Sequence, residues 1–372
     1  MSTSTAGPSA PGLGDTWARL TAGDLGDVDP VDLIAVVESV ASRASALDRG
    51  EADLRRDVTV LADLGLFDVD RTPVAVAAAI FEAVATESLA VAFAAWAQRM
   101  TAVYLRHAEH RSEATERAYR AVAAGERPGV TGMAAAQLQA VGLGEVPVTA
   151  TPIDGGYRID GPVAWASNLY ADSTIVLAAN TENGRSLVLA LEASDPGVTI
   201  QSAPDLLALN ATASTMIGLN GVVVPGEQVL GEDLPTFLAG ARAQFLILQA
   251  AFCSGVAARS VTEAERRLEG LGAFSAEEHA ALAARHEHMH SELHRLAARP
   301  GEATLTELLL LRLAGTEIAP AATRLEAILC GGMGYAQGAP ANRRMREAAF
   351  LPVQSPSQSQ LRWELDRLGV AT

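Results

Sequence analysis

The stretch that decides the fold reads Asp-Gly-Gly-Tyr-Arg-Ile-Asp-Gly-Pro-Val-Ala-Trp-Ala-Ser-Asn over residues 154–168. Its first three residues separate Val148-Thr-Ala-Thr from Tyr157-Arg-Ile-Asp160, two runs in which apolar and polar residues alternate. An Asp-Gly-Gly segment between alternating runs is typical of a hairpin turn, because glycine adopts the positive φ that tight turns need. The stretch therefore predicts two antiparallel strands.

The strand pattern extends to both sides of this hairpin, over residues 125–232. Further strands are expected at Ser173–Ala179, Ser186–Ala190, Val198–Gln201 and Gly221–Val224. Asn183-Gly184 and Asp195-Pro-Gly197 are turn sequences between them. Several short strands at regular spacing predict a small central β-barrel or sandwich.

Helical periodicity surrounds the strand-rich region. Residues 1–28 are rich in Ser, Thr, Gly, Pro and Asp, and we interpret them as a flexible leader. Residues 29–124 form the N-terminal helical domain, beginning with Asp29 as cap and Pro30 in the first turn. Residues 74–105 carry few charges, which predicts a helix buried on most sides.

The second helical region covers residues 233–372. It contains three long helical patterns, at Phe237–Glu269, Ser275–Ala298 and Leu305–Leu329. Ser275 and Glu278 have the spacing of a capping box, and Gly331 follows the last pattern as a helix end. The whole chain is thus predicted as an α+β protein, mainly α, with an N-terminal helical bundle, a central β-domain and a C-terminal four-helix bundle.

Composition excludes several classes of function. The net charge of −16, from 28 basic and 44 acidic residues, opposes nucleic-acid binding. No uninterrupted apolar run reaches the ~18 residues of a membrane span, and the first ten residues do not resemble a secretory signal. Two cysteines cannot form a disulfide framework, so we expect a cytoplasmic protein.

Three stretches in this order resemble the acyl-CoA dehydrogenase family. The first is Asp154–Gly161, followed by Trp165-Ala-Ser-Asn168 and Ala171-Asp172. The second is Leu219-Asn-Gly-Val-Val-Val-Pro225, followed by Val229-Leu-Gly231. The third is Cys330-Gly-Gly-Met-Gly-Tyr335, with Arg343, Arg344 and Arg346-Glu347 downstream. The resemblance covers about residues 125–362 and implies an FAD-dependent oxidoreductase that oxidises an acyl-CoA or a related small molecule.

The resemblance also implies which residues contact FAD. Thr131 matches a threonine that bonds the pyrimidine edge of the flavin, and Gly132 is a further expected contact. Trp165 matches a tryptophan at the isoalloxazine ring, and Ser167 matches a threonine or serine near the flavin N5. Residues toward the ADP half are Phe274, Gly331, Gly332 and Ser357. Because the ADP half in this family reaches a neighbouring subunit, we expect a homodimer, a homotetramer or a heteromer with a paralogue. Core packing, strand formation or helix ending would explain some of these residues equally well.

The sequence departs from the family pattern where FAD is usually held. The arginine that pairs with the pyrophosphate is replaced by Leu271, which leaves Arg266 or Arg267 as substitutes. The glutamine before the two glycines is replaced by Ile328. Each missing charge-assisted contact corresponds to about 1.5–3 kcal/mol, so weaker FAD binding is expected.

The general base of the family is also missing. Ser355 occupies the position of its usual glutamate, and the alternative position, near Gln244 and Phe245, is uncharged. The catalytic residue is therefore unknown, and three hypotheses stay open. The chain recruits another carboxylate, such as Glu347, Glu364 or Asp366; or it is a flavin monooxygenase, which needs no such base; or it is a non-catalytic subunit of a heteromer.

Five histidines lie between His279 and His294, and His286, His290 and His294 share one helical face. An i, i+4 pair of histidines is able to bind zinc. No cysteine and no clear set of carboxylate ligands accompanies them in sequence, and exposed helix polarity explains them as well, so we predict no metal site.

Overall fold

The N-terminal helices begin where the sequence provides caps. In the computed structural model, which describes residues 25–371, α2 (Pro30–Asp48) is capped by Asp29, whose carboxylate accepts the Val31 N–H at 2.8 Å. The interpretation of residues 1–24 as a leader lies outside the described residues. The helices that follow are α3 (Arg55–Asp63), α4 (Val74–Glu87), α5 (Leu89–Arg106) and α6 (Glu113–Ala123).

The predicted buried helix over residues 74–105 consists of two helices. Ser88 has the extended backbone angles φ −153° and ψ 112°, and its hydroxyl accepts the Val91 N–H at the start of α5. A serine that caps a new helix ends the preceding one, so α4 and α5 are separate. Every residue from Val76 to Leu105 is buried, as the scarcity of charge predicted.

The central strands form one eight-stranded sheet with the order β6-β7-β3-β2-β4-β5-β8, and β1 pairs with β4. The predicted hairpin is β2 (Thr149–Ile153) and β3 (Gly156–Ala166), joined at Gly155, whose φ is 75°. The other strands are β1 (Gly129–Gly132), β4 (Thr174–Thr181), β5 (Ser186–Glu192), β6 (Val198–Ile200), β7 (Thr215–Pro225) and β8 (Val229–Gly231). The hydrogen-bonded path ends at β6 and β8, so the sheet is open and not a closed barrel. A short helix, α7 (Ala134–Ala140), follows β1.

The C-terminal region contains three long helices, α8 (Leu234–Glu265), α9 (Ala276–Ala298) and α10 (Leu305–Cys330), followed by α11 (Gly332–Tyr335), α12 (Pro340–Ala348) and α13 (Gln358–Arg367). The predicted capping box at Ser275 is wrong. Because the 3₁₀ turn Gly270–Ser275 runs directly into α9, the Ser275 side chain makes no capping bond. A capping box is present instead at Thr304 and Glu307, where α10 begins.

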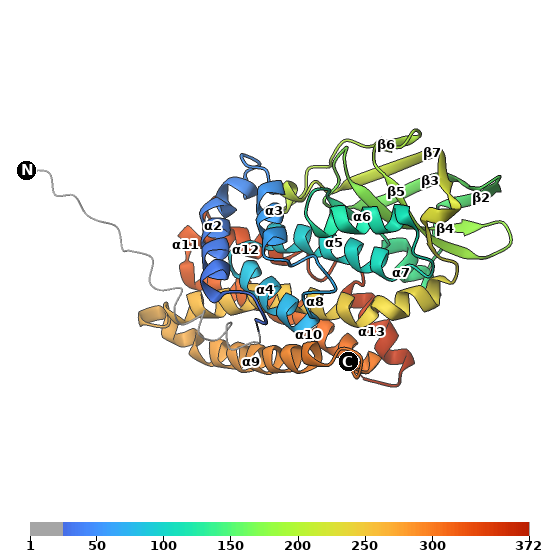
Figure 1. Cartoon of the computed structure of the whole chain (residues 1–372). Coiled ribbons are helices and arrows are strands. Elements are labelled where there is room, and N and C mark those ends of the chain that lie inside the picture. Colours follow the sequence, from blue (N-terminus) through green and yellow to red (C-terminus); the bar gives the residue numbers. More distant parts are fainter. Residues whose placement is uncertain (1–24, 372) are drawn as a thin grey trace, which may run out of the picture.

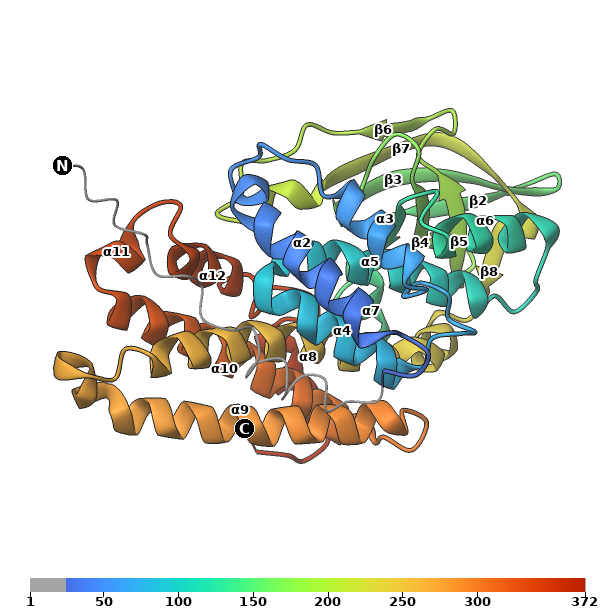
Figure 2. The same ribbon diagram turned by 60° about the vertical axis from the view of Figure 1, so that its left-hand side comes forward.

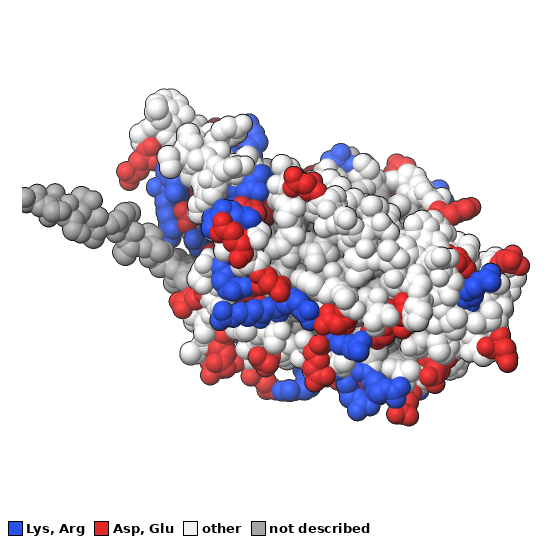
Figure 3. Space-filling model, turned by 90° about the horizontal axis from the view of Figure 1, so that it is seen from above, with Lys and Arg blue, Asp and Glu red and all other residues white. Residues whose placement is uncertain are grey.

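The sheet lies at one end of the molecule and the long helices run along the opposite side (Figures 1 and 2). One hydrophobic core extends from α2 through the sheet to α13, so the three parts are held together by shared packing. Helix α8 is long and apolar enough to cross a membrane, but 89% of its most apolar window is buried inside the protein. Seen from above, acidic and basic side chains are interspersed on the surface and neither forms a broad single-sign field (Figure 3).

Candidate functional site

A cavity of about 490 Å³ lies where the sheet meets the helices. One side comes from β1, the start of α7, the end of β3 and the segment 206–214, and the other from α5, α8 and the chain around α12. Three of the eight phenylalanines and two of the four tryptophans line it, namely Phe93, Trp96, Trp165, Phe245 and Phe350. Such a concentration of aromatic surface in a chain with 5% aromatic residues indicates a site for a flat or apolar ligand.

The aromatic side chains on the helical side form a packed wall. The rings of Phe93 and Phe350 lie 4.9 Å apart, and those of Trp96 and Phe245 lie 5.0 Å apart, both in edge-on contact. On the sheet side, the side chain of Trp165 is 53% exposed, although tryptophan has the largest side chain of the amino acids. An indole that projects from the end of β3 into a cavity offers a free face for stacking.

Three buried polar atoms without a hydrogen-bond partner belong to residues that line this cavity. They are Trp96 Nε1, Gln354 Nε2 and Ser355 Oγ. Leaving a buried donor unpaired costs about 1–3 kcal/mol, so such groups point to a ligand or to water that accepts their hydrogen bonds. Two of the three are N–H donors only, which favours a ligand with acceptor oxygens.

The segment that carries Gln354 and Ser355 is held in place by side chains of α8 and α10. Arg312 of α10 donates to the carbonyl of Leu351 at 3.0 Å and to Gln354 Oε1 at 3.2 Å. Gln249 of α8 donates its amide to the Ser355 carbonyl at 3.0 Å and accepts from Arg312 at 2.9 Å. Burial lowers the pKa of Arg312, which is surrounded by neutral acceptors. Because Arg312 holds the amide oxygen of Gln354, the amide nitrogen is the part of this side chain that lacks a partner.

Among the described residues that line the cavity, none is Asp, Glu or His, and Arg346 is the one charged side chain. Arg346 pairs with Asp48 of α2 at 2.9 and 2.5 Å, and this hydrogen bonding raises the pKa of the guanidinium. Within residues 25–371, the cavity lining therefore offers no carboxylate to act as a base.

The other carboxylates considered from the sequence lie outside the cavity lining. Glu347 is buried beside Arg343, at 3.2 Å, and burial raises its pKa. Glu364 pairs with Arg242 at 2.6 Å, and Asp366 is exposed on α13. Ser355, at the family's base position, does line the cavity.

Of the cofactor residues inferred from the resemblance, one group lines the cavity and a second group lies apart from it, while Gly132 and Ser357 are outside the cavity lining. Thr131, Trp165 and Ser167 line the cavity together, and the Ser167 hydroxyl lies 2.7 Å from that of Ser214. Gly132 is the last residue of β1, where a Cβ atom would come within 3.1 Å of Leu177 and Val163. Ser357 caps α13 by accepting the Gln360 N–H at 3.3 Å.

The second group is Phe274, in the 3₁₀ turn before α9, and Gly331 and Gly332, which follow α10; none of the three lines the cavity in the same chain. Phe274 is 90% exposed, and four other apolar residues of the 3₁₀ turn Gly270–Ser275, the end of α10 and α11 are exposed as well: Leu271, Ile328, Met333 and Tyr335. We call these five residues the apolar end patch. Arg266 and Arg267, the proposed substitutes for a pyrophosphate-binding arginine, both contact Glu263, at 2.8 and 3.0 Å.

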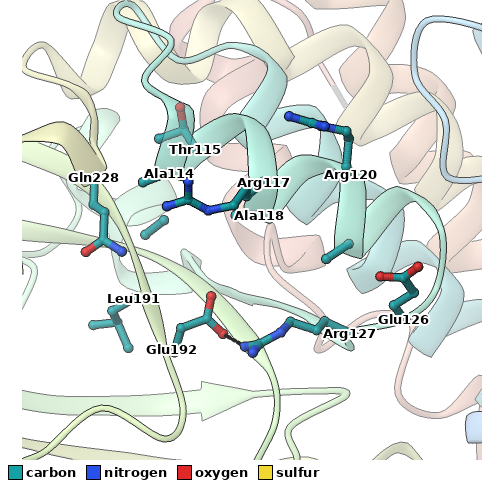
Figure 4. Close-up of a pocket in the computed structure, with 12 residues that line it drawn as sticks. Ala114, Thr115, Arg117, Ala118, Arg120, Glu126, Arg127, Leu191, Glu192 and Gln228 are labelled. Carbon is teal, nitrogen blue, oxygen red and sulfur yellow. Dashed lines mark hydrogen bonds and ion pairs between the residues drawn. The ribbon is translucent and has the colours of Figure 1, made fainter.

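A second hollow, of about 420 Å³, lies between α6 and β5 (Figure 4). It is lined by three arginines, but each already has a carboxylate partner. Arg127 pairs with Glu192, Arg117 with Glu113 at 2.7 Å, and Arg120 with Glu116 at 3.6 Å. Its positive charge is therefore compensated within the protein, and the aromatic cavity is the better candidate site.

Comparison with known proteins defines the class of fold. The solved structure of butyryl-CoA dehydrogenase from Megasphaera elsdenii matches with a TM-score of 0.79 and 17% identity, over 98% of this chain and 99% of that one. A glutaryl-CoA dehydrogenase from Mycobacterium smegmatis, solved in complex with FADH2, matches with a TM-score of 0.80 and 15% identity, over 94% and 96% of the chains. The chain has the acyl-CoA dehydrogenase fold, as its sequence motifs predicted.

Among curated proteins, the chain is similar to benzylmalonyl-CoA dehydrogenase of Aromatoleum aromaticum, strain EbN1. The two are 26% identical over 242 residues, which is 62% of this chain and 64% of that protein. The alignment thus spans less than two thirds of the relative's length. No protein-family model matches the chain.

Proposed function

We propose that the protein is an FAD-dependent oxidoreductase that acts on an acyl thioester or a related small molecule. The observation that carries this proposal is the aromatic cavity between the sheet and the helices, with an exposed Trp165 on one side and three unpaired polar groups on the other. A tricyclic ring and a substrate with acceptor oxygens would complement these two sides.

The residues on the sheet side of this cavity are of the types that contact a flavin ring. Trp165 would stack beside the isoalloxazine, and Thr131 and Ser167 would offer hydroxyls to its polar edge. When bound, FAD would accept a hydride from the substrate. Trp96, Gln354 and Ser355 would hold the substrate through its acceptor atoms and exclude water from the apolar remainder of the cavity.

Among the described residues, no carboxylate lines the cavity, which favours two alternatives beside the first candidate. A flavin monooxygenase of the same fold needs no base for an α-proton, and a non-catalytic subunit would need none either. The similarity to a benzylmalonyl-CoA dehydrogenase supports a CoA thioester as the first substrate class to test. We also propose that the protein self-associates through the apolar end patch. Its two free cysteines are consistent with a cytoplasmic location, which we propose as well.

The experiment is a flavin titration of the untagged full-length protein, followed by anaerobic addition of acyl-CoAs. We expect a flavin absorbance spectrum that is perturbed on binding and bleached by a substrate. Trp165→Ala should weaken FAD binding about tenfold, since a base–aromatic or ring–aromatic stack corresponds to about 1–3 kcal/mol. Trp363→Ala, on α13 and outside the cavity lining, is the matched control and should bind FAD like the wild type.

Absence of any FAD binding would overturn the proposal. Binding without reduction by any acyl-CoA, but with oxygen consumption when a flavin reductase is supplied, would favour the monooxygenase. Binding without either reaction would favour the non-catalytic subunit.

A further inference from the structure

Three side chains from two helices converge outside the aromatic cavity. Glu82 of α4 accepts from His290 Nδ1 at 2.9 Å through Oε1 and from His294 Nε2 at 2.8 Å through Oε2. The histidines are successive i, i+4 residues of α9, the long helix at the lower edge of Figures 1 and 2. Glu82 precedes them by 208 and 212 positions, so the carboxylate that the sequence pattern lacked is supplied by the fold.

We propose that Glu82, His290 and His294 form a binding site for a divalent transition-metal ion, with Zn²⁺ as the best-suited ion. One carboxylate and two imidazoles are a common zinc ligand set, and their ligand atoms all lie within 4.8 Å of one another. Metal bonds to such ligands are about 2.0–2.2 Å long, so the side chains would close in on a shared ion. Three protein ligands leave a fourth position for water.

The charge balance of the cluster supports a dication. Glu82 is completely buried, and a buried carboxylate needs a compensating positive charge. The rings of His290 and His294 lie 4.5 Å apart, and both present a ring nitrogen to this carboxylate. A metal ion held between the three side chains would supply that charge at the carboxylate.

The surroundings also have the features of a metal site. The Ser254 hydroxyl donates to Glu82 Oε1, and His286 Nε2 lies 3.0 Å from that hydroxyl, so the carboxylate is oriented by an outer layer of hydrogen bonds. The side chains of His290 and His294 are 17% and 21% exposed, which gives an ion a route from solvent. None of the three ligands lines the aromatic cavity, so the ion would tie α9 to α4 and take no part in the oxidation.

The test is a calorimetric titration of the untagged, chelator-treated full-length protein with Zn²⁺, paired with the visible spectrum after Co²⁺ addition. We expect one ion per chain and a higher Tm with Zn²⁺. The double variant His290→Gln/His294→Gln should bind at least about tenfold more weakly and should lose the Co²⁺ bands and the Tm increase. His288→Gln removes an exposed histidine from the same helix and should behave like the wild type.

Two results would overturn the proposal: no stoichiometric Zn²⁺ binding by the wild type, or undiminished binding by a double variant whose circular dichroism shows a folded protein. In either case the cluster is a hydrogen-bonded ion pair without metal. Glu82 is left unchanged in the test because its replacement would also remove the acceptor of three buried or half-buried hydrogen bonds. The outcome does not depend on flavin, so it is separate from that of the proposed oxidation.

Discussion

At the scale of single residues, Ser355 decides what the cavity can do to a substrate. Its hydroxyl is buried in the cavity wall without a partner, and its backbone carbonyl is fixed by Gln249. A serine hydroxyl is a weak base near neutral pH, and no histidine lines the cavity in the described chain to activate it. The position is thus well oriented but lacks the group that would remove a proton.

Restoring a carboxylate at this position should therefore create or accelerate dehydrogenation. For Ser355→Glu, we expect flavin reduction by an acyl-CoA to be at least about 100-fold faster than in the wild type, because a positioned general base contributes about 10²–10⁴-fold. Anaerobic stopped-flow absorbance of the flavin measures this rate. Ser355→Gln has the same size without the charge and should give no acceleration. Equal rates in the two variants would mean that position 355 does not face the reacting carbon.

The sequence identified cavity residues that follow one another within a recognisable stretch, such as Trp165 and Ser167. It missed residues whose role depends on packing between distant helices. Nothing near Trp96 or Gln354 in the sequence marks them as unpaired donors, since that property arises from Arg312 and from the aromatic wall. Glu82 was missed for the same reason, because its partners lie on another helix.

At the scale of helices, the contact between α4 and α8 depends on one glycine. A Cβ atom at Gly255 of α8 would lie 2.1 Å from the carbonyl oxygen of Glu82 and 2.8 Å from the Ala85 side chain. No real Cβ approaches backbone that closely, so the two helices would have to move apart. This close approach also brings Ser254 to the Glu82 carboxylate.

We expect Gly255→Ala to lower the free energy of unfolding by about 1–3 kcal/mol, as overpacking of a core usually does. The gain in helix propensity, about 1 kcal/mol, is too small to offset the larger end of that range. Urea denaturation followed by circular dichroism gives the value. Gly301→Ala is the control, because nothing lies within 4 Å of its Cβ position, and it should change stability little. A Gly255→Ala protein as stable as the control would mean that α4 and α8 are less closely packed.

Helix and strand periodicity located most elements of the chain, but local signals did not fix their ends. The break between α4 and α5 depends on one serine inside an apolar run, and a propensity pattern does not separate a cap from an interior serine there. Ser275 shows the converse, because its capping spacing is real but a 3₁₀ turn already continues into the helix. Whether a serine caps a helix or lies within a continuous one is decided here by tertiary packing.

At the scale of the whole molecule, the two groups of inferred FAD contacts do not meet within one chain. The residues inferred to contact the flavin ring line the aromatic cavity. Phe274, Gly331 and Gly332, inferred to contact the ADP half, are exposed and belong to the region of the apolar end patch. An exposed apolar surface of this kind is typical of an interface. If a second subunit brings its end patch to the cavity of the first, one FAD is held by two chains, and its pyrophosphate passes Leu271, which is apolar and exposed.

A positive charge at Leu271 should therefore strengthen FAD binding. We expect Leu271→Arg to lower the Kd for FAD about tenfold or more, since a charge-assisted hydrogen bond to phosphate corresponds to about 1.5–3 kcal/mol and 1.4 kcal/mol is a factor of ten. The gain should shrink as salt is added, because screening weakens an exposed contact. Equilibrium dialysis at two salt concentrations, with light scattering to report the oligomer, measures both effects.

The control adds the same charge elsewhere. Val31→Arg places an arginine at another exposed apolar position, on α2, and should leave the Kd for FAD near its wild-type value. If Val31→Arg tightened binding as much as Leu271→Arg, the effect would come from the net charge of an acidic protein and not from a contact. If Leu271→Arg had no effect in a protein that is oligomeric and binds FAD, the pyrophosphate would have to lie elsewhere, and the shared-cofactor arrangement would be wrong.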